Sequence, residues 1–262
     1  MLVNYRLISK QNLKQGELKA QPGNGTANTA QLPTFKQTQL LIKEKIHQKE
    51  IEQRDIKYRF TAYDESTKTI TLGLTWYQKV DEDIKQTVFN PDAMKERVEQ
   101  GIKQFKNSSA LISNSLGIHA LLETNDGFII LTKKALHGNI AAIGGYVDCP
   151  ENILETDTLE IDPFQDLVRE LAEPEEGLLL QPEDYTPELI GIAEQEYHLG
   201  TNILFHVKVN KPSTAFQNKT AKEHLEIYLI KPDEVAEFLK KTNTQLWYHT
   251  AALLDILDIT RF

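Results

Sequence analysis

IGGYVDCPENILETDTLEIDPFQDLVRELAEPEEGL, residues 143–178, is the stretch that decides the fold expected for this 262-residue chain. It starts with two glycines after a short apolar run and passes through an acidic connection into a helical pattern. Four of its last ten residues are glutamates. Like charges this close repel one another on a helix, so the pattern predicts a positive partner, and a metal ion is the hypothesis that it raises.

The pattern predicts a helix over residues 163–176. Asp162 is a suitable N-cap and Pro163 suits the first helical position, while Gly177 is placed to end the helix. Apolar residues recur on one face at helical spacing: Phe164, Leu167, Val168 and Leu171. Glu170 and Glu173 are three residues apart and therefore share a face.

Pro174 interrupts this helix and leaves two interpretations open. It has no N–H to donate to the carbonyl of Glu170 and costs about 3 kcal/mol inside a regular helix. In one interpretation the turn widens by one residue, as in a π-bulge, and brings Glu175 toward Glu170 and Glu173. In the other, the helix ends near residue 173 and the last glutamates are solvated.

The remaining chain alternates between strand and helix patterns. The first part predicts a strand at 3–9, a loop at 15–33, a helix at 34–53 capped by Thr34, a hairpin of 57–63 with 69–77, and a helix at 91–107 begun by Asn90 and Pro91. The second part predicts strands at 116–124 and 127–134 joined by Asn125-Asp126-Gly127, strands at 141–147, 188–197, 202–209 and 223–230, and helices at 232–241 and 250–259.

This order is typical of an α/β protein in which helices sandwich a mixed sheet. A break in the pattern at 108–115 divides the chain into a small α+β module, residues 1–110, and a larger domain, residues 115–262. The Gly, Asn, Thr and Pro content of 15–33 is typical of a loop.

Composition excludes several classes of function. The net charge of −9 argues against a general nucleic-acid binder. Cys149 is the single cysteine, so neither an internal disulfide nor a cysteine-rich zinc site is expected. No apolar run approaches the roughly 20 residues of a membrane span, and the first residues lack the pattern of a signal peptide. We therefore expect a cytoplasmic protein with no membrane partner, and its oligomeric state stays open.

Residues 143–178 resemble the signature of the Nudix hydrolases, G-x5-E-x7-R-E-U-x-E-E-x-G-U, where U is a bulky aliphatic residue. The matching positions are Gly145, Glu151, Arg169, Glu170, Leu171, Glu173, Gly177 and Leu178. Seventeen residues separate Glu151 from Arg169 where the family pattern has seven. One extra residue also precedes Gly177, so either Pro174 or Glu175 stands at the second glutamate of the family's E-E pair.

The resemblance implies an α/β/α sandwich and Mg²⁺-dependent cleavage of a nucleoside diphosphate derivative, with Mn²⁺ as a possible substitute. It implies that the metal ligands are the carbonyl of Gly144 and the carboxylates of Glu170, Glu173 and Glu175, with Glu176 as an alternative. It also implies that Arg169 pairs with Glu151. A further ligand or base is expected at Glu223 or, alternatively, Glu226; for either, a solvated carboxylate is the plain alternative.

The chain is also similar to the branch of this family that hydrolyses UDP-glucose. The similar stretches are KYRF (57–60), LGLTWY (72–77), LGIHALLETNDGF (116–128) and LIGIAEQE (189–196). UDP-glucose or UDP-galactose is therefore the expected substrate, giving UMP and a sugar 1-phosphate. ADP-ribose, another nucleoside diphosphate derivative, or a module that binds a nucleotide sugar without cleaving it are the alternatives.

Residues that contact the substrate are harder to identify. Gly145 is expected beside it, and a uracil ring could stack on one of four aromatic side chains: Tyr63, Trp76, Tyr77 and Tyr197. Aromatic residues at strand positions belong more often to the core than to a binding site. Tyr77 and Tyr197 are the two that we assign to substrate binding.

Overall fold

The computed structural model describes residues 4–27, 31–135, 138–174, 177–196, 200–217, 219, 222–242 and 244–260. Within these ranges eleven strands join one sheet, whose main path runs β1-β9-β10-β5-β3-β4-β2. The strands are β1 Tyr5–Ser9, β2 Lys19–Pro22, β3 Ile56–Asp64, β4 Thr69–Trp76, β5 Ser115–Thr124, β6 Ile129–Lys134, β7 Ile140–Ala141, β8 Ile143–Tyr146, β9 Tyr185–Gln195, β10 Gly200–Val209 and β11 His224–Ile230.

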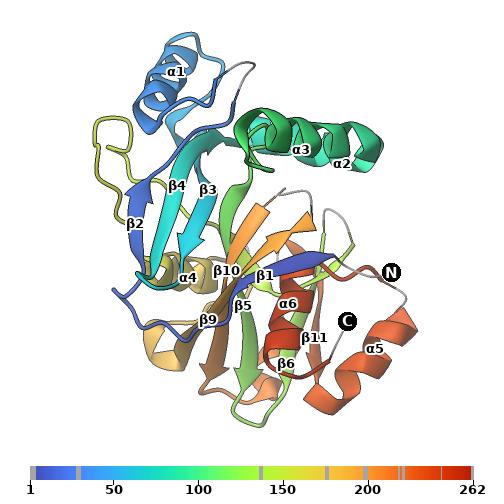
Figure 1. Cartoon of the computed structure of the whole chain (residues 1–262). Helices are drawn as coiled ribbons and strands as arrows, with labels where there is room; N and C mark the ends of the chain where they lie inside the picture. The colour runs from blue at the N-terminus through green and yellow to red at the C-terminus, as the bar shows by residue number, and fades with distance from the viewer. Residues whose placement is uncertain are drawn as a thin grey trace.

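Helices cover both faces of this sheet (Figure 1). They are α1 Phe35–His47, α2 Tyr77–Phe89, α3 Pro91–Phe105, α4 Pro163–Ala172, α5 Val235–Thr242 and α6 Tyr248–Ile256. Alternate side chains of β5 enter two cores: Ile118 packs in the core that contains Leu167 of α4, and Leu121 packs in the core that contains Leu253 of α6. Because successive side chains of a strand point to opposite faces, α4 and α6 lie on opposite faces of the sheet.

The sheet is mixed, as the sequence predicts. β10 pairs with β5 in parallel and β2 pairs with β4 in parallel, whereas the other named pairs are antiparallel. β5 is the central strand, since β3, β6, β8 and β10 all pair with it. The α/β class is confirmed, and the arrangement of sheet and helices is consistent with a Nudix-type sandwich.

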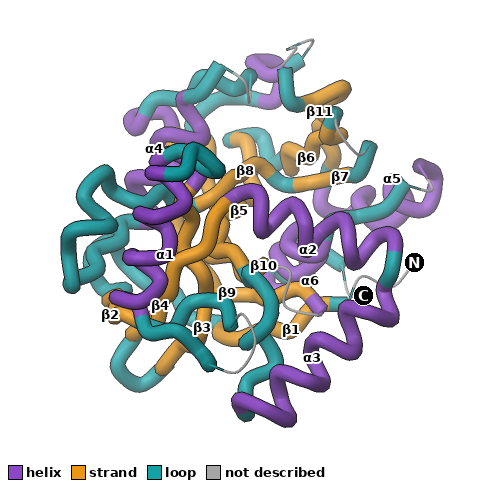
Figure 2. Tube along the Cα trace, turned by 90° about the horizontal axis from the view of Figure 1, so that it is seen from above, coloured by secondary structure: helices purple, strands orange, loops and turns teal. Residues whose placement is uncertain are grey.

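Strands from the first part of the chain join this same sheet. β1 pairs with β9 over four residue pairs, and β3 meets β5 through Arg59 and Ser115. Seen from above, α1 lies by β4, while α2 and α3 meet at one end and diverge from there (Figure 2). The division into residues 1–110 and 115–262 stays a prediction.

Most predicted elements are confirmed, and three in the first part of the chain need correction. The expected loop at 15–33 contains β2, which ends at Pro22 as an edge strand can. The expected helix at 34–53 has the predicted Thr34 cap but ends at His47, because Lys49 adopts a left-handed conformation with φ of +59°. Helix α2 was not predicted at all, and Tyr77 begins it rather than ending a strand.

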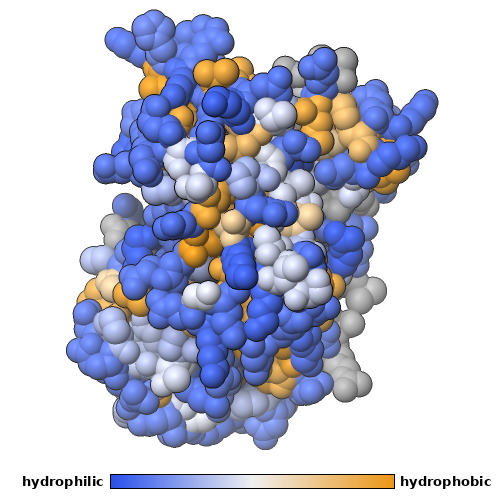
Figure 3. All heavy atoms as spheres, turned by 60° about the vertical axis from the view of Figure 1, so that its left-hand side comes forward, coloured by the Kyte–Doolittle hydropathy of each residue, from blue (hydrophilic) through white to orange (hydrophobic). Residues whose placement is uncertain are grey.

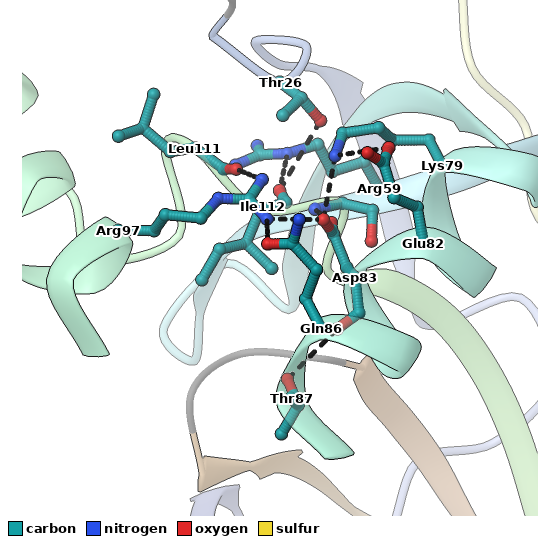
Figure 4. Close-up of polar contacts among 11 residues, drawn as sticks. Thr26, Arg59, Lys79, Glu82, Asp83, Gln86, Thr87, Arg97, Leu111 and Ile112 are labelled. Atoms are coloured by element: carbon teal, nitrogen blue, oxygen red, sulfur yellow. Dashed lines mark hydrogen bonds and ion pairs between the residues drawn. The ribbon is translucent and has the colours of Figure 1, made fainter. Parts of the chain in front are cut away.

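A buried carboxylate explains why α2 escapes a search for apolar periodicity. Asp83 of α2 is fully buried, and its Oδ1 accepts from Lys79 Nζ and from Arg97 Nη1 of α3, each at 2.8 Å (Figure 4). Its Oδ2 accepts from the backbone N–H of Ser113 at 2.8 Å. Burial opposes ionisation most, but Lys79 and Arg97 outweigh it and lower the pKa of Asp83. An ion-paired aspartate thus occupies an inward position that would normally hold an apolar residue.

The hydropathy of the helices and of one face of the molecule can be described for the residues that the structure covers. No helix there combines the length and the hydropathy that a transmembrane segment requires. The face of the molecule seen in Figure 3 is largely hydrophilic, with apolar residues in small separate areas.

Candidate active site

Two glycines bring the backbone of β8 into contact with its neighbours. Gly144 has φ of +153°, and a Cβ there would lie 2.1 Å from the carbonyl oxygen of Ile118 on β5. A Cβ on Gly145 would lie 2.5 Å from Oε1 and 2.8 Å from Oε2 of Glu170. Any other residue would force a shift at either position, so the Gly-Gly pair allows α4 to place a carboxylate directly on the strand.

Helix α4 is specified as the sequence predicts at its start. The side chain of Asp162 accepts from the N–H of Phe164 at 3.1 Å and that of Gln165 at 3.4 Å. Leu167 and Leu171 are fully buried against the sheet. Glu170 precedes Leu171 on this inward side and is 6% exposed, which is unusual for a glutamate.

Arg169 gathers the acidic side chains around Glu170. Its Nη1 lies 2.9 Å from Glu170 Oε1 and 3.0 Å from Glu173 Oε1. Its Nε lies 3.1 Å from Asp148 Oδ2, and its Nη2 donates to the carbonyl of Tyr146 at 3.1 Å. Burial is the largest single effect on the pKa of Arg169 and lowers it. The nearby carboxylates of Glu170, Asp148, Glu173 and Asp166 together outweigh burial, so the pKa is raised. One guanidinium therefore holds the end of β8, its following loop and the end of α4.

Two members of this cluster, Asp148 and Asp166, were not predicted. Asp166 lies 3.6 Å from Arg169 Nη2, and its Oδ1 accepts from the N–H of Asp148 at 3.2 Å. Burial raises the pKa of Asp166 to about 6, although that hydrogen bond and Arg169 oppose the shift. The spacing of Asp166 three residues before Arg169 is the signal that could have identified it.

The helix ends before Pro174, as the second interpretation predicted. Ala172 is its last residue, and Glu173 is extended with φ of −65° and ψ of 135°. A residue before proline disfavours helical ψ because the proline ring crowds it. The widened turn at Pro174 is therefore wrong, and the ending near residue 173 is confirmed. Gly177, with φ of +74°, lies in the turn that follows and does not end the helix directly.

Glu175 and Glu176 lie outside the described residues, so the structure does not place them. Glu170 and Glu173 do come together, since both carboxylates contact the same nitrogen of Arg169. In the described part of the chain, no three or more His, Cys, Asp or Glu side chains are grouped so as to hold a metal ion. A three-carboxylate site thus requires Glu175 or Glu176.

The predicted pairing of Arg169 with Glu151 is wrong. The side chain of Glu151 is exposed, and its carbonyl accepts from Gln53 Nε2 at 3.1 Å. Asp148 contacts the guanidinium instead. The long connection carries Glu151 away from α4 and toward the first part of the chain, which explains the difference.

Glu223 and Glu226 contact lysines of β6. Glu223 Oε2 lies 3.4 Å from Lys134 Nζ, and Glu226 Oε1 lies 3.5 Å from Lys133 Nζ. Both carboxylates are about half exposed. Neither is among the ion-pair partners of Arg169, so a role in the reaction remains a prediction.

Tyr77 is the aromatic candidate that lies beside the glycines. Its ring stands edge-on to that of Tyr146, with centroids 6.2 Å apart and planes at 89°, and it is 46% exposed. Lys57 Nζ lies 5.5 Å from the centre of the Tyr146 ring and 3.7 Å from Asp148. Tyr146 directly follows Gly145 in β8, so Tyr77 is an accessible ring in contact with the residue after the two glycines.

The other aromatic candidates have different surroundings. Tyr63 and Trp76 pack against the main core, and Tyr63 also donates to Gln11 Oε1 at 3.2 Å. Tyr197 lies outside the described residues. Burial raises the pKa of the Cys149 thiol, which disfavours the reactive thiolate form.

Comparison with known proteins yields distant structural likenesses alone. No protein-family model and no curated protein matches the chain. Solved structures that it resembles include a Nudix hydrolase from M. smegmatis, RenU, at 18% identity over 55% of this chain and 83% of that one, with a TM-score of 0.34. Ap4A hydrolase of C. elegans matches at 13% identity over 55% of this chain and 93% of its own, also with a TM-score of 0.34.

A third likeness is to a bifunctional NMN adenylyltransferase/ADP-ribose pyrophosphatase from Francisella tularensis, complexed with AMP and a manganese ion. It is 13% identical over 71% of this chain and 54% of that one, with a TM-score of 0.37. Many such neighbours are Nudix hydrolases.

Proposed function

We propose that this chain is a Nudix-type hydrolase that cleaves the pyrophosphate bond of a nucleotide sugar, UDP-glucose or UDP-galactose, to UMP and a sugar 1-phosphate. The observation that carries the proposal is the buried carboxylate of Glu170, seated on Gly145 and joined through Arg169 to Glu173. Burying a carboxylate is unfavourable, and a site for a cation would explain why the chain keeps one on β8.

The oxygen-rich donor groups near Arg169 are of the kind that a hard divalent cation prefers. Carboxylates outnumber the two cations, Arg169 and Lys57, that face them, and Mg²⁺ prefers oxygen ligands. Glu170, Glu173 and the carbonyl of Gly144 would hold Mg²⁺ or Mn²⁺, with Glu175 or Glu176 completing the set. A bound divalent ion would neutralise phosphate charge and lower the pKa of a water molecule.

The chain's own residues would orient the reactants. Arg169 holds Glu170 and Glu173 at one guanidinium nitrogen, and so fixes where two carboxylates face the substrate. In the reaction, a water oxygen bonds to one phosphorus while the bridging P–O bond breaks, and the bridging oxygen leaves with the other phosphate. A carboxylate accepts the proton of the water; Glu223 and Glu226 stay the candidates for that role.

Tyr77 would contact the base. Its ring is 46% exposed and stands edge-on to the ring of Tyr146. Tyr146 is the residue that follows Gly145 in the chain. Stacking on an aromatic ring suits uracil without requiring hydrogen bonds to it. Gly145 would border the same space, because it lies between Tyr146 and the metal-binding carbonyl of Gly144.

Phosphate release tests the proposal. Purified protein is incubated with UDP-glucose and Mg²⁺ in the presence of a phosphatase that acts on UMP and glucose 1-phosphate but not on the intact substrate. Glu170→Gln should abolish phosphate release, whereas Glu160→Gln, which alters an exposed residue of the same connection, should not. Full activity of Glu170→Gln would refute the assignment, and a parallel panel containing ADP-ribose would identify another nucleoside.

A second candidate is a module that binds a nucleotide sugar without cleaving it. The end of α4 at Ala172 favours it, because Glu173 is already extended and lies outside the helix that aligns Glu170. Calorimetry would then show binding of UDP-glucose by a protein that releases no phosphate over hours.

A further inference from the structure

The connection between β8 and α4, residues 147–162, packs on the first part of the chain. Figure 1 shows it as the olive loop between α1 and α4. Ile153 is fully buried, and Leu154 and Leu159 are 8% and 7% exposed. All three pack in the same core as Phe35 and Ile42 of α1. The connection is therefore a packed segment whose partner is α1.

One polar side chain of α1 fastens this segment. Gln39 is 4% exposed, and its Nε2 donates to the carbonyl of Ile153 at 2.8 Å and to that of Thr156 at 2.7 Å. A buried carbonyl without a donor is costly, so these two bonds fix where the segment crosses the helix. A glutamine amide has two N–H groups and can satisfy both carbonyls.

The ion pairs around Gln39 are weaker constraints. Lys43 Nζ lies 2.9 Å from Glu155, whose side chain is 72% exposed, and Lys36 Nζ lies 3.9 Å from Asp157, where both side chains are about three-quarters exposed. Exposed pairs of this kind contribute little. Gln39 is therefore the polar group of α1 best placed to hold the segment.

Both ends of the segment enter the candidate active site. At one end, Asp148 contacts Arg169 Nε at 3.1 Å and Lys57 at 3.7 Å. At the other end, Asp162 caps α4, the helix that carries Glu170. A shift of the segment would thus move both an anion that orients Arg169 and the first turn of α4.

We propose that Gln39 is a positioning residue: by holding residues 153–156 it keeps Asp148 and the start of α4 where the Arg169–Glu170 pair requires them. This inference rests on the proposed function for its kinetic part. Outer residues that orient a site typically change activity 10- to 100-fold when lost, and Gln39 belongs to that class although it lies on a helix outside the site.

The test compares Gln39→Met with Thr38→Val. Methionine keeps the length of the side chain and loses both donors. Thr38 is equally buried on the same helix, but its hydroxyl donates to Thr34 at 3.0 Å within α1. Gln39→Asn is the second variant: it keeps the amide group, but its side chain is too short to reach both carbonyls. It replaces Gln39→Met in the same measurements if Gln39→Met does not fold. Thermal unfolding measures how much stability each variant loses. The changes in hydrogen exchange and in kcat are then compared between variants with similar losses of stability.

Two readings decide the inference. In metal-free protein, hydrogen exchange should rise about tenfold in residues 150–160 and 163–167 for Gln39→Met, and stay near wild type in those residues for Thr38→Val. In UDP-glucose hydrolysis, kcat should fall about tenfold for Gln39→Met while KM changes less than about threefold. An equal fall in kcat for Thr38→Val, or faster exchange with unchanged kcat, would overturn the inference.

The proposed function can fail separately. If wild-type protein hydrolyses no nucleoside diphosphate derivative, the function is wrong, and exchange alone decides the role of Gln39. Faster exchange in residues 163–167 of Gln39→Met then supports the positioning of α4, and unchanged exchange there refutes it.

Discussion

The carboxylate of Glu170 lies on the bare Cα of Gly145, so close that a Cβ would come within 2.5 Å of Oε1. The Glu170 carboxylate of α4 therefore occupies the space that a side chain at Gly145 of β8 would need. The carboxylate is the end of a flexible side chain and can move away, whereas the strand is held by its pairing with β5. Anything added at Gly145 should move Glu170 rather than the sheet.

Gly145→Ala is expected to lower kcat for nucleotide-sugar hydrolysis about 100-fold, because a displacement near 1 Å at a reacting group has effects of that size. The loss of stability should be modest. Gly138→Ala is the control for the added methyl group: a Cβ there meets nothing within 4 Å, and its φ of +68° adds a backbone strain that Gly145→Ala does not have. Equal activities of the two variants in the phosphate-release assay would contradict the role given to this contact.

Arg169→Lys should weaken activity by more than tenfold, since an ammonium group cannot reproduce the separate contacts of a guanidinium with Asp148, Glu170 and the Tyr146 carbonyl. Stability should fall by about 1–3 kcal/mol because Glu170 stays buried beside fewer donors. Urea unfolding and kinetics on the same preparation give both values. A variant with wild-type kinetics would show that Arg169 has only a structural role.

Asp166 predicts an unusual pH dependence of stability. Burial raises its pKa to about 6 in the folded protein, above the value near 3.9 of an unfolded aspartate. A group with a raised pKa favours folding while it is protonated, so its contribution is complete below about pH 4 and is lost as the pH rises through about 6. Asp166→Asn should therefore stabilise the protein by about 2 kcal/mol at pH 7, and the gain should vanish near pH 4. Urea unfolding across this range would refute the assignment if the gain were constant.

Asp83→Asn should lower stability by about 3 kcal/mol, because it leaves Lys79 and Arg97 beside a neutral side chain in a buried place. Activity measured where the variant is still folded should stay close to wild type, since this cluster joins α2, α3 and the segment at Ser113. Denaturant titration followed by kinetics at low temperature checks both. A large loss of kcat in fully folded protein would connect the cluster to the reaction.

Tyr77→Ala should raise KM for UDP-glucose about fivefold with a small change in kcat, as expected for loss of one stacking contact worth about 1 kcal/mol. Tyr77→Phe should retain wild-type KM. Phe89→Ser alters an exposed aromatic residue, 82% accessible, at the other end of α2 and provides the control. An unchanged KM in Tyr77→Ala would place the base elsewhere.

Local signals predicted much of this architecture. Thr34, Asn90 and Asp162 cap helices as expected, and Asn125-Asp126-Gly127 turns the β5–β6 hairpin. These features depend on a few adjacent residues, which is why a sequence can reveal them. The segments that escaped prediction depend on distant partners: β2 exists through its pairing with β4, and α2 through the ion pairs of Asp83.

The candidate site was predictable to a similar extent. The glycines, Arg169 and Glu170 follow from the resemblance to the Nudix signature, and the structure brings Gly145, Arg169 and Glu170 together. Asp148 replaces Glu151 at the arginine because a seventeen-residue gap has no fixed path until it packs on α1. Its course is a tertiary property, and no local pattern encodes it.

The pairing of β1 with β9 has a consequence for the order in which the chain folds. Arg6 and Glu194, joined at 2.6 Å, are separated by 188 residues along the chain. During synthesis β1 leaves the ribosome long before β9 has been made. Until β9 is available, the backbone N–H and C=O groups of β1 that later pair with it are without that partner. Such distant pairings slow folding, so β1 should be among the last parts of the sheet to acquire protection after dilution from denaturant.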